Sequence, residues 1–187
     1  MKVLPSKIEG LLTIEPAVFE DHRGYFYEGF NNEKLKAALG ADFTVRQLNF
    51  SKSSRGVLRG LHFQHPPFDQ SKLISCNAGE ILDVVVDMRQ GSPTYGQHEK
   101  VLLSGDNKLR FFVPSGFAHG FLVLSETAEI MYAVDQNYSA AHDAGISYND
   151  PALSIDWGVD QRDLTISDKD KKLPTLDAVD NQFKYHV

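Results

Sequence analysis

Short apolar runs alternate with turn-forming residues along almost the whole chain. Segments such as Gly91-Ser92-Pro93 and Pro114-Ser115-Gly116 separate the runs and are typical of turns. Many short strands at this spacing predict an all-β sandwich or small barrel. We find no repeat or linker, so we expect one domain over residues 1–187. The runs that predict strands are Leu11–Ile14, Val57–Phe63, Ile81–Met88, Val101–Leu103, Leu109–Val113, Gly120–Leu124 and Ile130–Val134.

Two segments favour helices. An apolar stripe at helical spacing follows Asn31 and Asn32, either of which can cap a helix, and precedes Gly40, which can end it. The stripe consists of Leu35, Ala38 and Leu39. The segment after Ser167 favours a second, shorter helix or a turn.

The strand predicted at 81–88 places two carboxylates on one face. Alternation puts Asp83 and Asp87 on the same side as Ile81 and Val85. Two interpretations remain open. Either this face is solvated, or Asp83 points into a polar barrel interior, where a site is usual in such an architecture.

The composition and net charge of the chain reduce the number of possible classes of function. The chain is 42% hydrophobic, which suits a sizeable core, and its net charge of −6 argues against non-specific nucleic-acid binding. Cys76 is the only cysteine, so no internal disulfide forms, and its apolar surroundings predict burial. Residues 1–5 lack the apolar region of a signal peptide, and no run approaches the ~20 apolar residues of a membrane span. We therefore expect a cytoplasmic protein without a membrane partner.

The run Val57–Gln64 carries one arginine and one histidine with possible chemistry. Strict alternation would put Arg59 and His62 on opposite faces of a strand. A β-bulge at Gly60 would shift the parity and turn both side chains inward. A single histidine on a strand is more often structural than catalytic, so this run alone does not establish an active site.

Further polar residues lie on or beside apolar strands. A buried Lys72 or Asp170 would need a partner or a ligand, because uncompensated burial of a charge is costly. The alternative for both is an ordinary surface ion pair. Composition and spacing leave this choice open. The other polar residues in such positions are Gln47, Asn49, His119 and Tyr132.

Long collinear stretches then supply a resemblance. They are Asp21–Glu28, Gly56–Gln64, Gln70–Leu73, Gly79–Asp87, Pro114–Phe121, Gly145–Pro151 and Ser167–Asp170, together with Tyr132 and Tyr138. With these stretches the chain resembles the dTDP-4-dehydrorhamnose 3,5-epimerase family over nearly its whole length. A single short motif would be far less specific.

The resemblance implies an all-β, cupin-type jelly-roll barrel with a few short helices, usually a homodimer, with a site inside each barrel. It implies a nucleotide-diphospho-4-keto-6-deoxysugar substrate and no metal or other cofactor. The expected reaction inverts C3 and C5 of dTDP-4-dehydro-6-deoxy-D-glucose. His62 would be the general base and Asp170 would orient it. Tyr132 would return a proton on the opposite face, and Lys72 would stabilise the enolate oxygen.

The resemblance also implies the substrate contacts. Arg59, Gln47 and Asn49 would hold the diphosphate or the sugar, and Tyr138 would pack near the nucleotide base. Arg23 and Phe26 match positions that reach the ligand of a neighbouring subunit. The remaining predicted substrate-binding residues are Glu28, Asp83, His119 and Asp143.

The segment after Tyr138 departs from the family pattern. Ala140 stands where proline is expected, Asp143 where glutamate is common, and Tyr148 where tryptophan is frequent. These changes leave the expected base and acid intact. They leave open the exact nucleotide and sugar, and an epimerase acting at only one carbon is the nearest alternative.

Two further classes of function compete. A metal-dependent cupin could use His62, His65 and His119, and Pro114–His119 resembles part of a cupin metal motif. The chain lacks the His-x-His pair and the glutamate that follows it in such enzymes, which argues against this alternative. A non-catalytic sugar-nucleotide binder would keep Arg59 but would not need an acid and a base.

Overall fold

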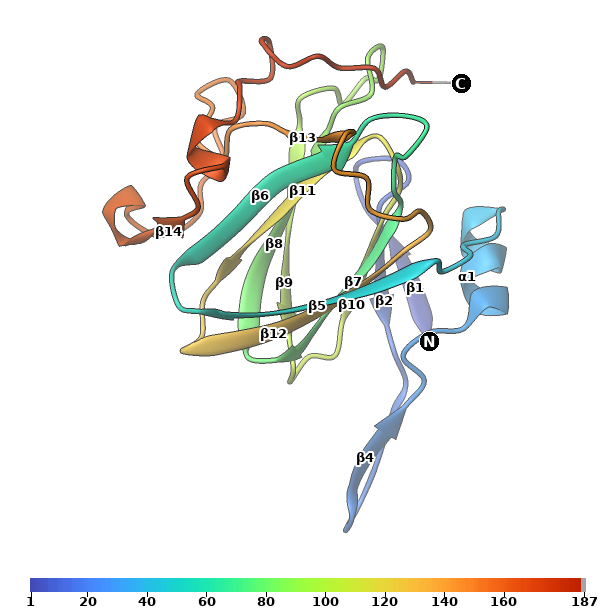
Figure 1. Cartoon of the computed structure of the whole chain (residues 1–187). Coiled ribbons are helices and arrows are strands. Elements are labelled where there is room, and N and C mark those ends of the chain that lie inside the picture. The colour runs from blue at the N-terminus through green and yellow to red at the C-terminus, as the bar shows by residue number, and fades with distance from the viewer. Residues whose placement is uncertain (186–187) are drawn as a thin grey trace.

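Two antiparallel sheets form the barrel in the computed structural model, which describes residues 1–185 (Figure 1). The first sheet contains, in spatial order, β1 (Lys2–Pro5), β2 (Leu12–Glu15), β10 (Arg110–Val113), β7 (Lys72–Ala78), β12 (Thr127–Val134) and β5 (Gln47–Ser54). The second sheet contains β13 (Asp143–Gly145), β6 (Val57–Gln64), β11 (Phe117–Val123), β8 (Glu80–Asp87) and β9 (His98–Ser104). Its sixth strand, the short β14 (Thr165–Ile166), pairs with β6 in parallel. This arrangement is the expected jelly roll.

Alternating side chains bury both faces of the second sheet. Val85 and Phe121 point between the two sheets and pack against Ile74 and Phe111 of the first sheet. The opposite face of the second sheet is covered by the chain that follows β13, including Trp157 and Phe183. Each fully buried side chain of this size contributes roughly 1.5–3 kcal/mol. The core therefore fixes the relative position of the two sheets.

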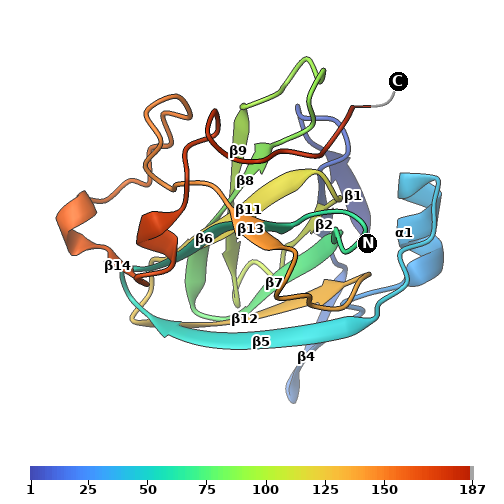
Figure 2. The ribbon, with the colours of Figure 1, turned by 45° about the horizontal axis from the view of Figure 1, so that its top comes forward.

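Helix α1 (Asn32–Leu39) forms as predicted. The side chain of Asn31 accepts a hydrogen bond from the Lys34 N–H, and Gly40 ends the helix in the left-handed conformation with φ of 72°. Leu35 packs on the outer face of the first sheet, beside which the helix lies in Figure 2. The predicted stripe was wrong at Ala38, which is exposed because it lies beyond the narrow contact with the sheet.

The helical turn expected after Ser167 is the 3₁₀ helix η2 (Asp170–Lys172). The Ser167 hydroxyl accepts the Asp170 N–H at 3.1 Å, which satisfies a backbone donor at the start of the turn. A second 3₁₀ turn, η1 (Gln161–Asp163), precedes β14. In residues 1–185, no helix has both the length and the apolar character needed to cross a membrane.

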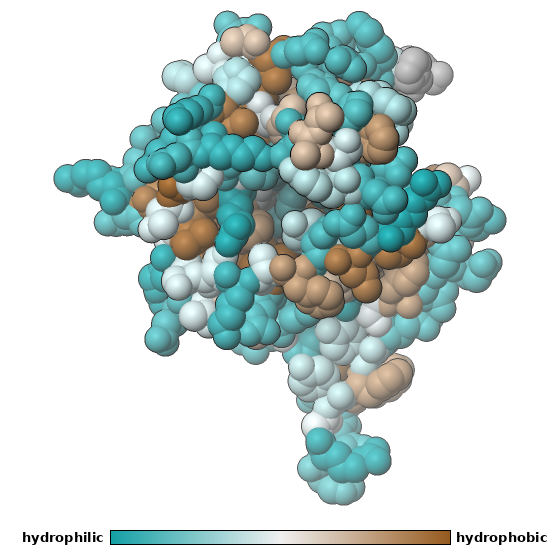
Figure 3. Space-filling model, viewed as in Figure 1, coloured by the Kyte–Doolittle hydropathy of each residue, from teal (hydrophilic) through white to brown (hydrophobic). Residues whose placement is uncertain are grey.

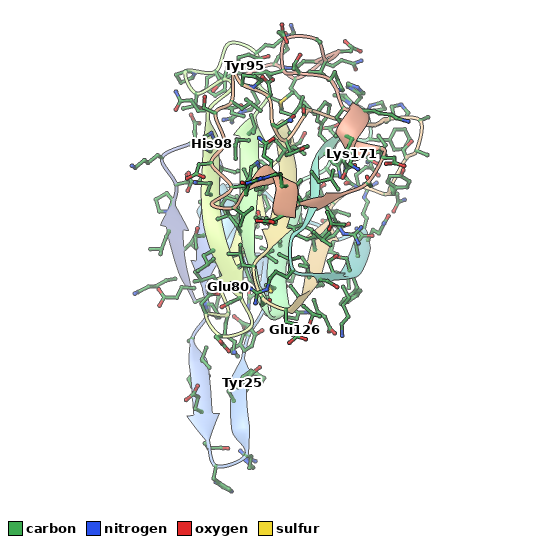
Figure 4. All side chains as sticks on the ribbon, turned by 90° about the vertical axis from the view of Figure 1, so that its left-hand side faces the viewer. Tyr25, Glu80, Tyr95, His98, Glu126 and Lys171 are labelled. Carbon is green, nitrogen blue, oxygen red and sulfur yellow. The ribbon has the colours of Figure 1, made fainter. Side chains whose placement is uncertain are left out.

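A hairpin of β3 (Val18–Asp21) and β4 (Gly24–Tyr27), called the arm below, projects away from the barrel (Figures 1 and 3). Figure 4 shows Tyr25 on this arm, well below the two sheets. Phe19 and Phe26 are 65% and 70% exposed. The arm therefore presents large apolar side chains without covering them.

Candidate active site

One cavity of about 660 Å³ opens between the two sheets. Its walls come from β5, β7 and β12 on one side, from β6 and β11 on the other, and from the segments around residues 138–143 and 165–170, which include the start of β13 and all of β14. The predicted site residues that line it are His62, Tyr132, Asp170, Lys72, Gln47, Asn49, Arg59, His119, Tyr138 and Asp143. Site residues from six strands thus converge on one space.

The predicted β-bulge turns Arg59 and His62 to the same side. In the ladder between β6 and β11, His62 pairs with His119 and Arg59 pairs with Phe121. The two residues between Arg59 and His62 therefore face Gly120 alone. Both side chains line the cavity, so the predicted change of parity is confirmed.

Glycine is required on both sides of this bulge. Gly60 has φ of 122°, and a Cβ atom there would lie 2.6 Å from the Cα of Gly120. A Cβ atom on Gly120 would lie 2.6 Å from the carbonyl oxygen of Arg59. The two backbones can approach this closely only without side chains, and that approach aims Arg59 and His62 into the cavity.

His62 forms a dyad with Asp170. Nε2 of His62 lies 2.8 Å from Oδ1 of Asp170, and Oδ2 of Asp170 accepts the Gly60 N–H at 3.2 Å. Burial favours the neutral acid, but the hydrogen bond and charge of His62 prevail and hold the pKa of Asp170 below its ordinary value. An ionised Asp170 keeps the proton of neutral His62 on Nε2, so Nδ1 carries the lone pair. The surface ion-pair alternative is wrong for Asp170, which is 4% exposed.

Tyr132 faces the cavity from the other sheet. It lies on β12, where it pairs with Asn49 of β5, whereas His62 lies on β6. Burial raises the pKa of the Tyr132 phenol, against the opposing charge of Arg59. The phenol is therefore protonated at neutral pH and can donate a proton. A base and an acid stand on opposite walls.

Lys72 is a buried cation at the start of β7. It is 7% exposed, and among residues 1–185 no carboxylate lies within ion-pair distance of its ammonium group. The surface ion-pair alternative is therefore wrong for Lys72 as well. Burial lowers its pKa to about 8, although the charges of Asp135 and Asp143 favour the ammonium form. A desolvated ammonium group interacts strongly with an anion that enters the cavity.

The polar residues of β5 and the loop after β12 are linked by hydrogen bonds. Gln47 donates from Nε2 to Oδ1 of Asn49 at 2.6 Å, and its Oε1 accepts the Tyr138 N–H at 2.9 Å. Arg59 donates from Nε to the Ser53 hydroxyl at 3.1 Å. This network orients amide and guanidinium groups along one wall of the cavity.

Tyr138, Asp143 and Lys169 meet at the edge of the cavity. The Tyr138 hydroxyl donates to Oδ2 of Asp143 at 3.1 Å, and Lys169 forms an ion pair with the same carboxylate. Lys169 was not among the predicted site residues, although it lies in a stretch that carried the resemblance and directly precedes Asp170. The negative charge of Asp143 raises the pKa of Tyr138. The short Asp143 side chain is thus already engaged within the chain.

Asp83 lies behind His119 and does not line the cavity. Oδ2 of Asp83 is 2.8 Å from Nε2 of His119, and Asp83 is fully buried, so the solvated-face interpretation is wrong. Burial raises the pKa of Asp83, against the effect of His119. Asp87 on the same face is also buried and is bound by Arg89. Asp83 can reach a ligand only through His119, which corrects its predicted place in the cavity wall.

Three predicted contacts lie away from the cavity of their own chain. Arg23 pairs with Asp21 at the tip of the arm, and Phe26 is exposed on the arm. Glu28 follows the arm and binds Lys34. Arg23 and Phe26, the two residues expected to reach a neighbouring subunit, therefore do not line the cavity of their own chain, and neither does Glu28.

The three histidines considered as metal ligands do not form a metal site, because each is engaged elsewhere and only His62 and His119 line the cavity. His62 binds Asp170, His119 binds Asp83, and His65 stacks edge-on against Phe63. No group of three His, Cys, Asp or Glu side chains in residues 1–185 has an arrangement suited to a metal ion.

Comparisons with known proteins agree with the resemblance. The family model for dTDP-4-dehydrorhamnose 3,5-epimerase matches residues 5–178. The enzyme of that name from Escherichia coli (strain K12) is 46% identical over 179 residues, covering 96% of each chain. The crystal structure of a dTDP-6-deoxy-D-glucose-3,5-epimerase from Legionella pneumophila Philadelphia 1, in complex with dTDP-4-keto-L-rhamnose, has a TM-score of 0.95 and 42% identity, covering 100% of this chain and 99% of that one.

The chain is also similar to a solved structure of an epimerase whose name gives a different reaction. A 3'-monoepimerase from Streptomyces bikiniensis, in complex with dTDP-quinovose, has a TM-score of 0.87 and 38% identity, covering 92% of this chain and 87% of that one. The family match spans every stretch that carried the resemblance. The chain therefore belongs to the dTDP-4-dehydrorhamnose 3,5-epimerase family.

Proposed function

We propose that the chain is a cofactor-independent epimerase that converts dTDP-4-dehydro-6-deoxy-D-glucose into dTDP-4-dehydro-L-rhamnose by inverting C3 and C5. The observation that carries the proposal is the placement of the His62–Asp170 dyad and Tyr132 on opposite walls of one cavity, with a buried ammonium group beside them. The names of the family relatives support the same reaction. A dTDP-deoxysugar pathway would use this product.

The ketone at C4 makes both neighbouring carbons weakly acidic, because the carbanion delocalises onto oxygen as an enolate. Nδ1 of His62 accepts the C–H proton, and Asp170 stabilises the imidazolium that forms. A positioned base contributes about 10²–10⁴-fold. This is insufficient for so weak a carbon acid, so the enolate oxygen must also be stabilised. The Lys72 ammonium group performs that role.

Inversion requires that the proton return from the opposite side. Tyr132 donates its phenolic proton to the enolate carbon, and the C–H bond forms on the face away from His62. The His62 imidazolium then releases the abstracted proton to solvent, and the Tyr132 phenolate takes a proton from solvent, which restores both groups. The same pair of groups serves C3 and C5 in turn, because both carbons adjoin the C4 ketone.

The remaining cavity residues bind the substrate. Arg59 holds the diphosphate with its guanidinium fork, which suits phosphate better than an ammonium group does. Gln47 and Asn49 contact the sugar or the diphosphate, and His119 lines the sugar pocket. Tyr138 packs near the nucleotide base, with Asp143 beside it.

Deuterium exchange tests the proposed reaction. We expect chelator-treated protein, incubated with dTDP-4-dehydro-6-deoxy-D-glucose in deuterated water, to introduce deuterium at both C3 and C5 in proton NMR spectra. Exchange at one carbon would identify a mono-epimerase instead, an outcome made relevant by the engaged Asp143 and by the 3'-monoepimerase relative. Exchange only after metal is added would favour a metal-dependent cupin, and binding without exchange would favour a sugar-nucleotide binder.

Replacing Tyr132 with Phe separates the two proton transfers. We expect Tyr132→Phe to lower product formation by at least tenfold more than it lowers deuterium exchange into the substrate, because His62 still removes the proton. NMR time courses measure both rates in one sample. Equal loss of exchange and inversion would remove Tyr132 from the donor role.

We further propose that the chain works as a homodimer in which each arm reaches the partner's cavity. Large apolar side chains are exposed on the arm and on the outer face of β5, where Leu48 and Phe50 are 55% and 72% exposed. Figure 3 shows apolar surface gathered on the barrel above the arm. Patches of this kind mark protein interfaces.

Subunit mixing tests the arm. We expect the His62→Ala and Arg23→Ala proteins to be weakly active alone, and an equimolar refolded mixture to recover about a quarter of wild-type activity, because half of the dimers then hold one intact site. Turnover before and after mixing measures the recovery. The matched control is a mixture of His62→Ala with Lys7→Ala. The Lys7→Ala subunit keeps both a wild-type arm and His62, so the activity of this mixture depends only on how many subunits carry His62. No gain with Arg23→Ala would show that the arm does not act on the partner's cavity.

A further inference from the structure

Strand β5 presents a row of polar side chains toward the cavity. The alternate residues of the row are Gln47, Asn49, Ser51 and Ser53, and the first three line the cavity. Their neighbours Leu48 and Phe50 point outward, as the period of two in a strand requires. Asn49 pairs with Tyr132, so Ser51 and Ser53 lie successively further along the strand from the proposed proton donor.

Ser51 is the member of the row without a partner. Gln47 bonds to Asn49, and Ser53 accepts a hydrogen bond from Arg59. In the part of the chain that the structure describes, the Ser51 hydroxyl is buried and has no hydrogen-bond partner. An unsatisfied buried hydroxyl costs about 1–3 kcal/mol. Rotation about the Cα–Cβ bond directs it into the cavity that Ser51 lines, where a ligand atom can accept its proton.

Arg59 indicates which ligand atom that is. Its Nε is held by the buried Ser53 hydroxyl, so the two terminal amino groups remain for a ligand. No carboxylate of the described chain forms an ion pair with Arg59. Arg59 lines the same cavity as Ser51 and Tyr132, and Ser53, which holds its Nε, lies two residues from Ser51 on β5. A phosphoryl oxygen suits both a guanidinium fork and a hydroxyl donor.

We infer that Ser51 donates a hydrogen bond to a phosphoryl oxygen of the substrate diphosphate bound by Arg59, and that Ser53 is a positioning residue that aims Arg59. The identity of the ligand rests on the proposed function. The inference adds two serines to the site, one that touches the substrate and one that acts through Arg59. The two roles follow from the difference in their hydrogen bonding.

Calorimetry with dTDP tests the role of Ser51. A hydrogen bond to a charged acceptor is worth about 1.5–3 kcal/mol, so Ser51→Ala should weaken dTDP binding about tenfold or more. We expect a similar rise in KM for the sugar nucleotide, with kcat within about threefold of wild type. Ser54→Ala is the matched control, because Ser54 lies on the same strand, is exposed and faces away from the cavity.

Several outcomes would overturn the assignment of Ser51. Unchanged dTDP affinity in a folded Ser51→Ala protein would overturn it, and a raised KM with unchanged dTDP affinity would place the hydroxyl against the sugar instead. A wild-type protein that does not bind dTDP would overturn it too. Failure of the proposed reaction can be distinguished from failure of the Ser51 assignment. If only the reaction is wrong, the wild-type protein binds dTDP but does not exchange deuterium into the substrate. The comparison of dTDP affinities then still decides the role of Ser51.

A double-mutant cycle tests Ser53. We expect Ser53→Ala to weaken dTDP binding severalfold in the wild-type background and to have no effect when Arg59 is already alanine. Ser53→Thr keeps the hydroxyl and should restore most of the affinity. A loss of the same size with and without Arg59 would show that Ser53 acts through the fold and not through Arg59.

Discussion

Replacing His62 with alanine is expected to lower kcat by about 10²–10⁴-fold, the range that positioned general bases contribute. The dyad with Asp170 places the proton of neutral His62 on Nε2, so the lone pair that accepts the substrate proton is lost with the ring. Deuterium exchange at C3 and C5 should fall together with turnover, because removal of the proton precedes every later step. NMR measures both quantities.

The affinity for dTDP should remain within a fewfold of wild type, since the diphosphate contacts lie on other residues. The matched control is His98→Ala, because His98 lies on β9, outside the cavity (Figure 4). It should leave kcat unchanged. Retained activity in His62→Ala would remove His62 from the mechanism, and equal losses in both variants would point to a general defect of folding.

Replacing Lys72 with methionine is expected to lower kcat by about 10²–10³-fold, as the loss of roughly 3–4 kcal/mol of oxyanion stabilisation implies. Methionine fills similar space, so the cavity wall stays packed. The free energy of unfolding, in contrast, should rise in the same variant. Folding buries the Lys72 charge and lowers its pKa from an ordinary 10.5 to about 8, which costs on the order of 3 kcal/mol at neutral pH.

The variant should therefore have a higher Tm than wild type while losing activity. Because the folded pKa lies below the unfolded one, the destabilisation by Lys72 is complete below pH 8 and disappears as the pH rises to about 10.5. The Tm advantage of the variant should shrink over the same interval. Calorimetric unfolding at several pH values measures it, and a variant that is both inactive and less stable would contradict this account.

The pH profile provides a second test of Lys72. The ammonium form is the active one, so kcat/KM should decline above about pH 8 as the free enzyme loses that proton. Lys72→Arg keeps a cation that does not titrate in this range and should lose the decline near pH 8. A decline that persists in Lys72→Arg would belong to another group.

The strands of the jelly roll could be predicted where apolar residues form runs. All seven predicted runs overlap strands, from β2 to β12. Strand β5 was missed for a physical reason: its inward face is polar because it forms the cavity wall, and its apolar residues Leu48 and Phe50 point outward. The alternation of apolar residues therefore does not reveal this strand, although it lines the cavity.

The residues of the site also divide into those that could be predicted from the sequence and those that could not. Gly60 allowed the bulge to be predicted, because glycine inside a strand suggests close backbone approach. The pairing of Asp83 with His119 could not be predicted, because the two residues are 36 positions apart in the sequence. Only the ladder between β8 and β11 brings them together. Ser51 was missed because small hydroxyl residues are common on exposed strands, and only the three-dimensional structure reveals that this hydroxyl has no partner.

The two walls of the cavity have a consequence for how specificity can evolve. The proposed base and acid stand on different sheets, and the spacing between packed sheets, about 10 Å, is set by the hydrophobic core. The width of the cavity is therefore set by side chains such as Phe111 and Val85, which pack between the sheets and do not line the cavity. Sugar preference can change by substitution of residues along the strands that line the cavity. A change in core volume, in contrast, would alter the distance between the proposed base and acid and so impair both proton transfers at once.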